Sequence, residues 1–227
     1  MKSKNYCDYA WRKKREVVYQ TLNMLLDRLK AKVRLLDVGC GDGTQTKKYY
    51  EIILKKGKVA FVVGIDINAH YLSHNGIIDF IVGDARSLPF KDESFDLIIS
   101  TEVIEHFIEG ELFLNECYRI LKESGVLILT TPNRSRITAL PRSLIYKIKG
   151  ENYVPGPNPD HVREYTPTEL VKILEECGFT VKRVDFIAFN PYLPLPTKLC
   201  FMLDKISDKF RGLGKLLKWD MLIVAEK

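Results

Sequence analysis

The sequence predicts an α/β fold in which helices cover both faces of a parallel sheet. Two observations predict it. Short apolar runs typical of buried strands alternate with helical segments along most of the chain. One strand-to-helix turn, in the stretch LLDVGCGDG at residues 35–43, carries three glycines at alternate positions. The chain has 227 residues, of which 46% are hydrophobic, so we expect one sizeable core and a single domain over residues 1–227.

Composition and charge exclude several classes of protein. The formal charge is +6, but 35 basic residues are interspersed with 29 acidic ones, which supports only a weak attraction to anionic partners. The five cysteines include no C-x-x-C pair, which is typical of free thiols in a reducing compartment and not of structural zinc. Residues 12–15 are charged where a secretory signal needs apolar residues, and no apolar run approaches the roughly 20 residues of a membrane span. We expect a cytoplasmic protein.

The first elements are a covering helix and a βαβ unit. Residues 8–31 place apolar side chains at intervals of three and four, which predicts an amphipathic helix. Residues 33–38 form a short β-like run, and 44–56 a helix that ends at Gly57. Residues 59–66 (VAFVVGID) are almost continuously apolar, as is typical of a strand that is buried on both faces.

The alternation continues toward the end of the chain. The remaining elements are expected as strands at 77–82, 95–100 and 126–131, a helix at 111–123 closed by Gly125, and final strands at 179–188 and 221–225. A capping box at Thr166, with a proline at the first helical position, starts a further helix that ends at Gly178.

Two irregular segments interrupt this order. Residues 133–164 hold four prolines in a basic stretch, and a connection of this length is typical of a lid or binding loop. Residues 191–218 hold three prolines and then an apolar pattern at helical spacing, surrounded by lysines. Three interpretations of this second segment stay open: a helix packed on the sheet, the wall of an apolar pocket, or a helix at a membrane surface.

The glycine loop at 39–43 indicates a ligand that rests on main chain. Glycine tolerates positive φ and lets a ligand approach the backbone closely, although a simple tight turn is the alternative. A dinucleotide loop reads G-x-G-x-x-G, and here its third glycine is replaced by Thr44. Asp37, directly before the loop, disfavours a pyrophosphate, and Asp66 closes the next strand where a carboxylate can bind ribose hydroxyls. The pattern favours an adenosine that carries positive charge.

The ordered motifs resemble those of class I S-adenosylmethionine-dependent methyltransferases. They are Asp37-x-Gly39-x-Gly41-x-Gly43, Asp66, Gly83-Asp84-Ala85, and the strand FDLIIS followed by 102–106, and the match covers roughly residues 33–188 with the final strand also in place. The resemblance implies a doubly wound, seven-stranded, mostly parallel sheet with an antiparallel last strand. It also implies S-adenosylmethionine as cofactor, and S-adenosylhomocysteine as product.

The resemblance further implies which residues bind the cofactor. Asp37 and the loop Gly39, Cys40, Gly41 and Gly43 hold its methionine end, Asp66 the ribose, Ile67 the adenine face, Asp84 and the Ala85 backbone the adenine edge, with Thr101 as a further contact. For Asp84 the alternative is a cap on the following turn.

Catalytic candidates follow the fourth strand, at the carboxyl edge of the sheet, where the acceptor should enter. His106 is the first candidate for a base or an acceptor-positioning group, with Glu102 beside it, although a helix-start or core histidine is the alternative. Glu102, Glu105 and His106 are similar to the metal-binding stretch of the ubiquinone-pathway O-methyltransferases, which makes a divalent cation a secondary expectation. The same subgroup resemblance places His161 and Tyr165 at the acceptor pocket, and a solvated loop is the alternative.

The resemblance implies a methyltransferase that methylates an oxygen or carbon atom of a small, partly apolar molecule. The segments 133–164 and 191–218 are then expected to be insertions on the acceptor side. Methylation of RNA or protein is a second interpretation, and a non-catalytic, cofactor-binding partner subunit a third. We expect a monomer or homodimer with peripheral membrane contact at most. His70 and His74 lack a third ligand nearby and are expected to be surface residues.

Overall fold

The computed structural model describes residues 2–68, 78–136, 160–189, 195–209 and 211–227. His70, His74, Phe210 and most of the 133–164 segment therefore lie outside the described residues.

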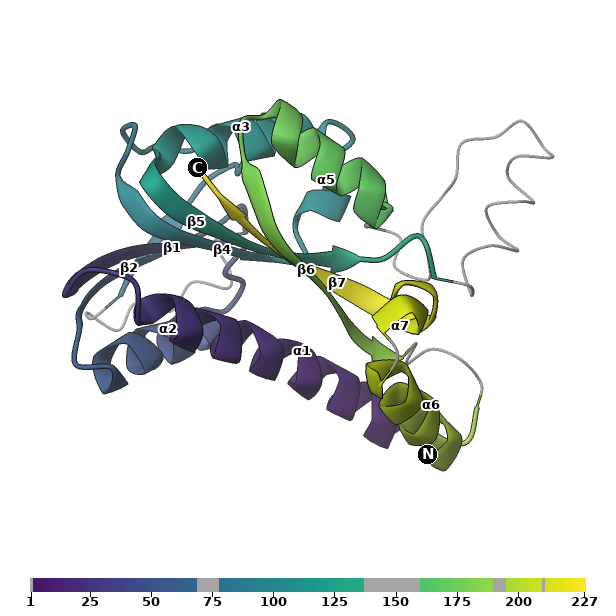
Figure 1. The fold of residues 1–227 in the computed structure, drawn as a ribbon. Coiled ribbons are helices and arrows are strands. Elements are labelled where there is room, and N and C mark those ends of the chain that lie inside the picture. The colour runs from purple at the N-terminus through teal and green to yellow at the C-terminus, as the bar shows by residue number, and fades with distance from the viewer. Residues whose placement is uncertain (1, 69–77, 137–159, 190–194, 210) are drawn as a thin grey trace.

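A seven-stranded sheet in the order β3-β2-β1-β4-β5-β7-β6 forms the centre of the molecule (Figure 1). The strands are β1 Lys32–Val38, β2 Val59–Asp66, β3 Asp79–Val82, β4 Phe95–Thr101, β5 Leu121–Pro132, β6 Thr180–Phe189 and β7 Lys218–Glu226. β7 runs antiparallel to both β5 and β6, and β1 to β5 pair in parallel. The expected mostly parallel sheet with an antiparallel last strand is confirmed.

Helices cover both faces of the sheet. They are α1 Lys2–Leu26, α2 Thr44–Lys55, the 3₁₀ turn η2 Ile104–His106, α3 Gly110–Ile120, α5 Pro167–Glu176, α6 Thr197–Lys209 and α7 Arg211–Leu217. Figure 1 shows α1 and α2 on one face and α3 and α5 on the other, while α6 lies beside the N-terminal end of α1. Within the described ranges, no helix is both long and apolar enough to cross a membrane.

The core consists of two apolar layers, one on each face of the sheet. Successive side chains of β1 alternate between them: Leu35 belongs to the layer under α1, and Leu36 to the layer under α3 and α5. On α1, side chains four residues apart form one buried stripe, which contains Tyr6, Ala10, Lys14, Val18, Leu22 and Leu26. The covering helix therefore begins earlier than residue 8 and ends before Leu29.

Another predicted helix also ends earlier than expected. The helix expected at 111–123 ends at Ile120, because Leu121 already pairs with Phe95 as part of β5. The ladder between β4 and β5 is irregular after this pair and resumes at Leu97 and Val126, where the sequence predicted the strand to start. Ser124 has a positive φ of 62°, so a local turn separates the two parts of the strand.

Candidate active site

The glycine loop folds tightly over the carboxyl ends of β1 and β2. The Gly39 and Cys40 amides donate to the Ile65 carbonyl at 2.8 and 3.1 Å, and all three glycines have positive φ. A Cβ on Gly39 would lie 2.2 Å from a Val103 methyl group, so the loop also packs against the segment after β4. Only glycine fits this position, since both the backbone angle and the space exclude a side chain.

Asp37 lies beneath this loop and not on its surface. Its side chain is 1% exposed, and the Thr46 hydroxyl on α2 donates to it at 2.6 Å. Burial raises the pKa of this carboxyl to about 7, although the hydrogen bond from Thr46 opposes the shift. The carboxyl is directed at α2, and its contact with the cofactor's methionine end stays a prediction.

Asp66 connects the end of β2 to the glycine loop. One carboxylate oxygen accepts from the Gly41 amide at 2.8 Å and the other from the Asn68 amide at 2.9 Å. The next residue, Ile67, is 70% exposed, an unusual value for an isoleucine, at the position predicted to cover adenine. Both residues lie at the carboxyl edge of the sheet, where open α/β folds bind their ligands.

Asp84 is engaged in its own turn. Its carboxylate accepts from the Arg86 amide at 2.9 Å and pairs with the Arg86 guanidinium at 2.6 Å. These hydrogen bonds lower the pKa of Asp84, mainly through the Arg86 side chain. The capping alternative is thus the geometry observed, while the contacts of Asp84 and half-buried Ala85 with adenine stay predictions. The side chain of Cys40 is buried, which raises the pKa of its thiol to about 12, and the contact of this loop residue with the cofactor stays a prediction.

The segment after β4 places Glu102 between distant parts of the chain. Thr101, which ends β4, is half-buried, and Glu102 follows with a positive φ of 57°. The Glu102 carboxylate lies 2.9 Å from the Lys14 ammonium of α1 and accepts from the Thr130 hydroxyl at 3.2 Å. Lys14 also reaches Asp220 on β7 at 2.8 Å. The sequence interpretation missed Lys14 and Asp220, although a lysine on the apolar stripe of α1 is a visible anomaly.

The two candidate histidines meet at the same edge. The amides of Val162 and Arg163 donate to the Glu105 carbonyl, which holds the segment with His161 against η2. The rings of His106 and His161 are 5.1 Å apart and nearly perpendicular. His106 Nδ1 lies 2.8 Å from the carbonyl oxygen of Asp160. Burial, and then the neighbouring His106, lower the pKa of His161, which favours the neutral ring.

The predicted metal ligands do not form one cluster. Glu102 pairs with Lys14, so this carboxylate already has a cation. The donor atoms that lie within 4.8 Å of one another belong instead to Glu105, His106 and His161. Glu105 is fully buried, which raises the pKa of its carboxyl, and one of its oxygens has no hydrogen-bond partner among the described residues. Glu102 is thus replaced by His161 in the observed group of possible ligands, and metal binding stays a secondary prediction.

Tyr165 does not line an open site. It is 1% exposed in the layer under α3 and α5, where burial raises the pKa of its hydroxyl to about 12. The predicted role in acceptor binding is therefore replaced by a packing role. A cavity of about 1100 Å³ lies at the opposite, amino edge of the sheet, lined by residues such as Met24, Lys122 and Val126. It contains no predicted site residue.

The fold and the loop are those of a Rossmann-like α/β domain, and they resemble the methyltransferase domain that the motifs predict. Residues 36–129 match the family model for a methyltransferase domain. These residues are thus similar to a domain of the S-adenosylmethionine-dependent methyltransferases, the family whose cofactor the motifs predict.

Curated relatives agree with this assignment. A probable S-adenosylmethionine-dependent methyltransferase of Mycolicibacterium smegmatis is 31% identical over 76% of this chain and 60% of its own length. The mitochondrial ubiquinone biosynthesis O-methyltransferase of Rattus norvegicus is 30% identical over 70% of this chain and 48% of its own length. This chain thus spans less than two thirds of either relative.

Solved structures show the same fold at low sequence identity. An S-adenosylmethionine-dependent methyltransferase from Archaeoglobus fulgidus has a TM-score of 0.58 and 23% identity, covering 98% of this chain and 99% of its own. The [4+2]-cyclase SpnF has a TM-score of 0.62 and 19% identity, covering 91% of this chain and 80% of its own. Since these two proteins are named for different chemistries, the fold alone does not define the reaction.

Proposed function

We propose that this protein transfers the methyl group of S-adenosylmethionine to an oxygen of a small, partly apolar molecule. The cofactor is expected at the glycine loop, with its ribose on Asp66 and its adenine beside Ile67. Relatives named as ubiquinone biosynthesis O-methyltransferases favour oxygen over carbon as the methylated atom.

The observation that carries the proposal is the hydrogen bond between His106 and the Asp160 carbonyl, at 2.8 Å. A carbonyl oxygen only accepts, so Nδ1 of a neutral His106 must carry the proton. Nε2 then has a free lone pair, which is the state that a general base requires. His106 is exposed, and its side chain lies at the carboxyl edge of the sheet.

The proposed reaction follows from this tautomer. Nε2 of His106 takes the hydroxyl proton of the acceptor, and the acceptor oxygen attacks the methyl carbon in line with the carbon–sulfur bond. That bond breaks, its electrons return to sulfur, and S-adenosylhomocysteine leaves as a neutral thioether. The sulfonium is a good leaving group, so the protein mainly aligns the two reactants and excludes water.

A screen with methyl-labelled S-adenosylmethionine tests the proposal. Separate metabolite, lipid, RNA and protein fractions are offered to the wild type and to His106→Ala. The proposal predicts label in a small molecule, in an alkali-stable methyl ether, and much less label with the variant. Label in RNA or protein supports the second interpretation instead. Cofactor binding without any labelled fraction supports a non-catalytic partner subunit.

A further inference from the structure

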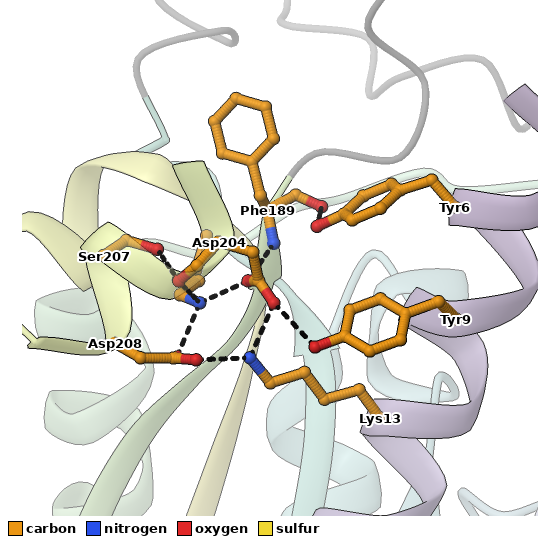
Figure 2. A network of polar contacts seen from close by, with 8 residues as sticks. Tyr6, Tyr9, Lys13, Phe189, Asp204, Ser207 and Asp208 are labelled. Atoms are coloured by element: carbon orange, nitrogen blue, oxygen red, sulfur yellow. Dashed lines mark hydrogen bonds and ion pairs between the residues drawn. The ribbon is translucent and has the colours of Figure 1, made fainter. Parts of the chain in front are cut away.

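Two adjacent lysines of α1 reach two different carboxylate clusters. Figure 2 shows the first, in which Lys13 contacts Asp204 and Asp208 of α6 at 2.7 and 2.8 Å. Lys14 points into the second, on the acceptor side, where it contacts Glu102 and Asp220. One helix therefore connects the acceptor edge of the sheet with α6.

The Lys13 cluster fixes α6 in place. Asp204 is 1% exposed and accepts from the Phe189 amide at 2.9 Å and the Tyr9 hydroxyl at 3.1 Å (Figure 2). It also pairs with the ammonium group of Lys218. Asp204 thus keeps a second cation if Lys13 is lost, which makes Lys13 a suitable comparison for its neighbour.

The Lys14 cluster has only one lysine for its two carboxylates. Lys14 is 5% exposed, and burial alone lowers the pKa of a lysine. Asp220 and Glu102 more than offset that effect and raise the pKa, so Lys14 remains an ammonium. Loss of this cation would leave Glu102 and Asp220 close together without a cation in direct contact, since Arg136 acts on Asp220 only from a longer distance.

Glu102 depends on side-chain contacts for its position. Its backbone adopts the left-handed conformation, which is uncommon for a residue with a long side chain. The next residue, Val103, packs directly against Gly39 of the cofactor loop. The Glu102 carboxylate itself lies on the β5 side of β4, and its position there is set by the contacts with Lys14 and Thr130.

We propose that Lys14 is a positioning residue of the active site, which holds the Glu102 carboxylate at the carboxyl end of β4 to face the sulfonium charge of S-adenosylmethionine. This inference rests on the proposed function for the identity of the cofactor. It assigns the N-terminal helix a role in binding, in addition to its role as a cover of the sheet.

The two forms of the cofactor test this inference without any acceptor. S-adenosylmethionine and S-adenosylhomocysteine differ by one methyl group and one positive charge, so the ratio of their affinities reports the charge beside the sulfur. If Lys14 acted only as a cation, its removal would favour the sulfonium. If it positions Glu102, its removal disfavours the sulfonium, because the carboxylate loses its partner and turns away.

Calorimetric titration of both ligands gives this ratio for each variant. Lys14→Met is expected to lower the affinity for S-adenosylmethionine, relative to S-adenosylhomocysteine, about fivefold, which corresponds to about 1 kcal/mol. Glu102→Gln should lower the ratio by a similar factor, and the double variant no further, since one residue acts through the other. Lys14→Arg should keep the affinity ratio close to that of the wild type, and Lys13→Met should change the ratio less than twofold.

If Lys14→Met does not fold, the double variant Lys14→Met/Asp220→Asn is measured instead. It removes one carboxylate together with the lysine, so less unpaired negative charge is left in the cluster. An unchanged or increased ratio in the Lys14 variants, or additive effects with Glu102→Gln, would overturn the inference while methyl transfer by the wild type stays intact. Conversely, if the wild type transfers label to none of the fractions, the proposed activity is overturned. The ratio of the two cofactor affinities still tests the role of Lys14 in that case.

Discussion

The part of the carboxyl edge that is proposed to bind the cofactor (the cofactor edge) and the part that is proposed to bind the acceptor (the acceptor edge) are built in different ways. The cofactor edge consists of backbone amides and short contacts within residues 37–68, such as Gly41 with Asp66. The acceptor edge joins side chains from α1, β4, β7 and the segment before α5, which are up to 206 positions apart in the pair Lys14 and Asp220. Adjacent strands with glycine turns produce the first arrangement locally, whereas the second exists only once the whole domain has folded.

The largest expected effect lies at the acceptor edge. His106→Ala should lower methyl transfer about 10²- to 10⁴-fold, the usual contribution of a general base, with little change in cofactor affinity. His161→Ala is the matched comparison, since its ring is adjacent but lies beside buried Glu105. Turnover under saturating cofactor and calorimetric affinity give the two readouts. Equal losses in both variants, or a loss of cofactor binding, would contradict the assigned base.

The next effect lies at the cofactor edge. Asp66→Ala removes the partner of the Gly41 amide and the predicted ligand of the ribose hydroxyls. Two charge-assisted hydrogen bonds are worth about 3 kcal/mol, so affinity for S-adenosylmethionine should fall about 100-fold. Asp27→Ala, an exposed carboxylate at the other end of the sheet, serves as control in the same calorimetric titration. An affinity close to that of the wild type in Asp66→Ala would remove the ribose assignment.

The two edges also differ in how much of each could be predicted from the sequence. The βαβ unit, the loop and Asp66 were predictable because strand periodicity and glycine conformation act within a few residues. The partner of Glu102 was not, because Lys14 and Asp220 meet only through the packing of α1 on the far strands. Tyr165 was misplaced for a related reason: the capping box predicts where α5 starts, but not which side chains before it turn inward.

A smaller effect concerns the buried acid under the loop. The pKa of Asp37 is raised to about 7 in the fold, so the folded state binds more protons than the unfolded state between about pH 4 and 7. This contribution to stability is fully present below pH 4 and is lost as the pH rises through 7. Asp37→Asn mimics the protonated form and should gain about 2 kcal/mol, relative to wild type, between pH 5 and 7.

Denaturant unfolding at several pH values checks this prediction. Asp92→Asn is the control, because this carboxylate is exposed and pairs with Arg119 at the surface. Parallel stability curves for wild type and Asp37→Asn would mean that Asp37 is ionised throughout, as an open ligand for the cofactor would be.

The smallest expected effect concerns the capping box at the start of α5, which is formed by residues close together in the sequence. Thr166 accepts from the Glu169 amide, and the Glu169 side chain accepts from the Thr166 amide, as the sequence predicted. Thr166→Ala should cost about 1 kcal/mol of unfolding free energy, with a stability control in the nearby exposed Thr168→Ala. If methyl transfer falls more than stability accounts for, the start of α5 also contributes to the acceptor site.

The labelled methyl assay with paired cofactor titration tests the whole account most directly. We predict that the wild type transfers label from S-adenosylmethionine to the oxygen of a small molecule, and that His106→Ala binds the cofactor with nearly unchanged affinity but transfers little label. Equal labelling by wild type and His106→Ala, or label confined to RNA or protein, would contradict an acceptor edge built for a small-molecule hydroxyl.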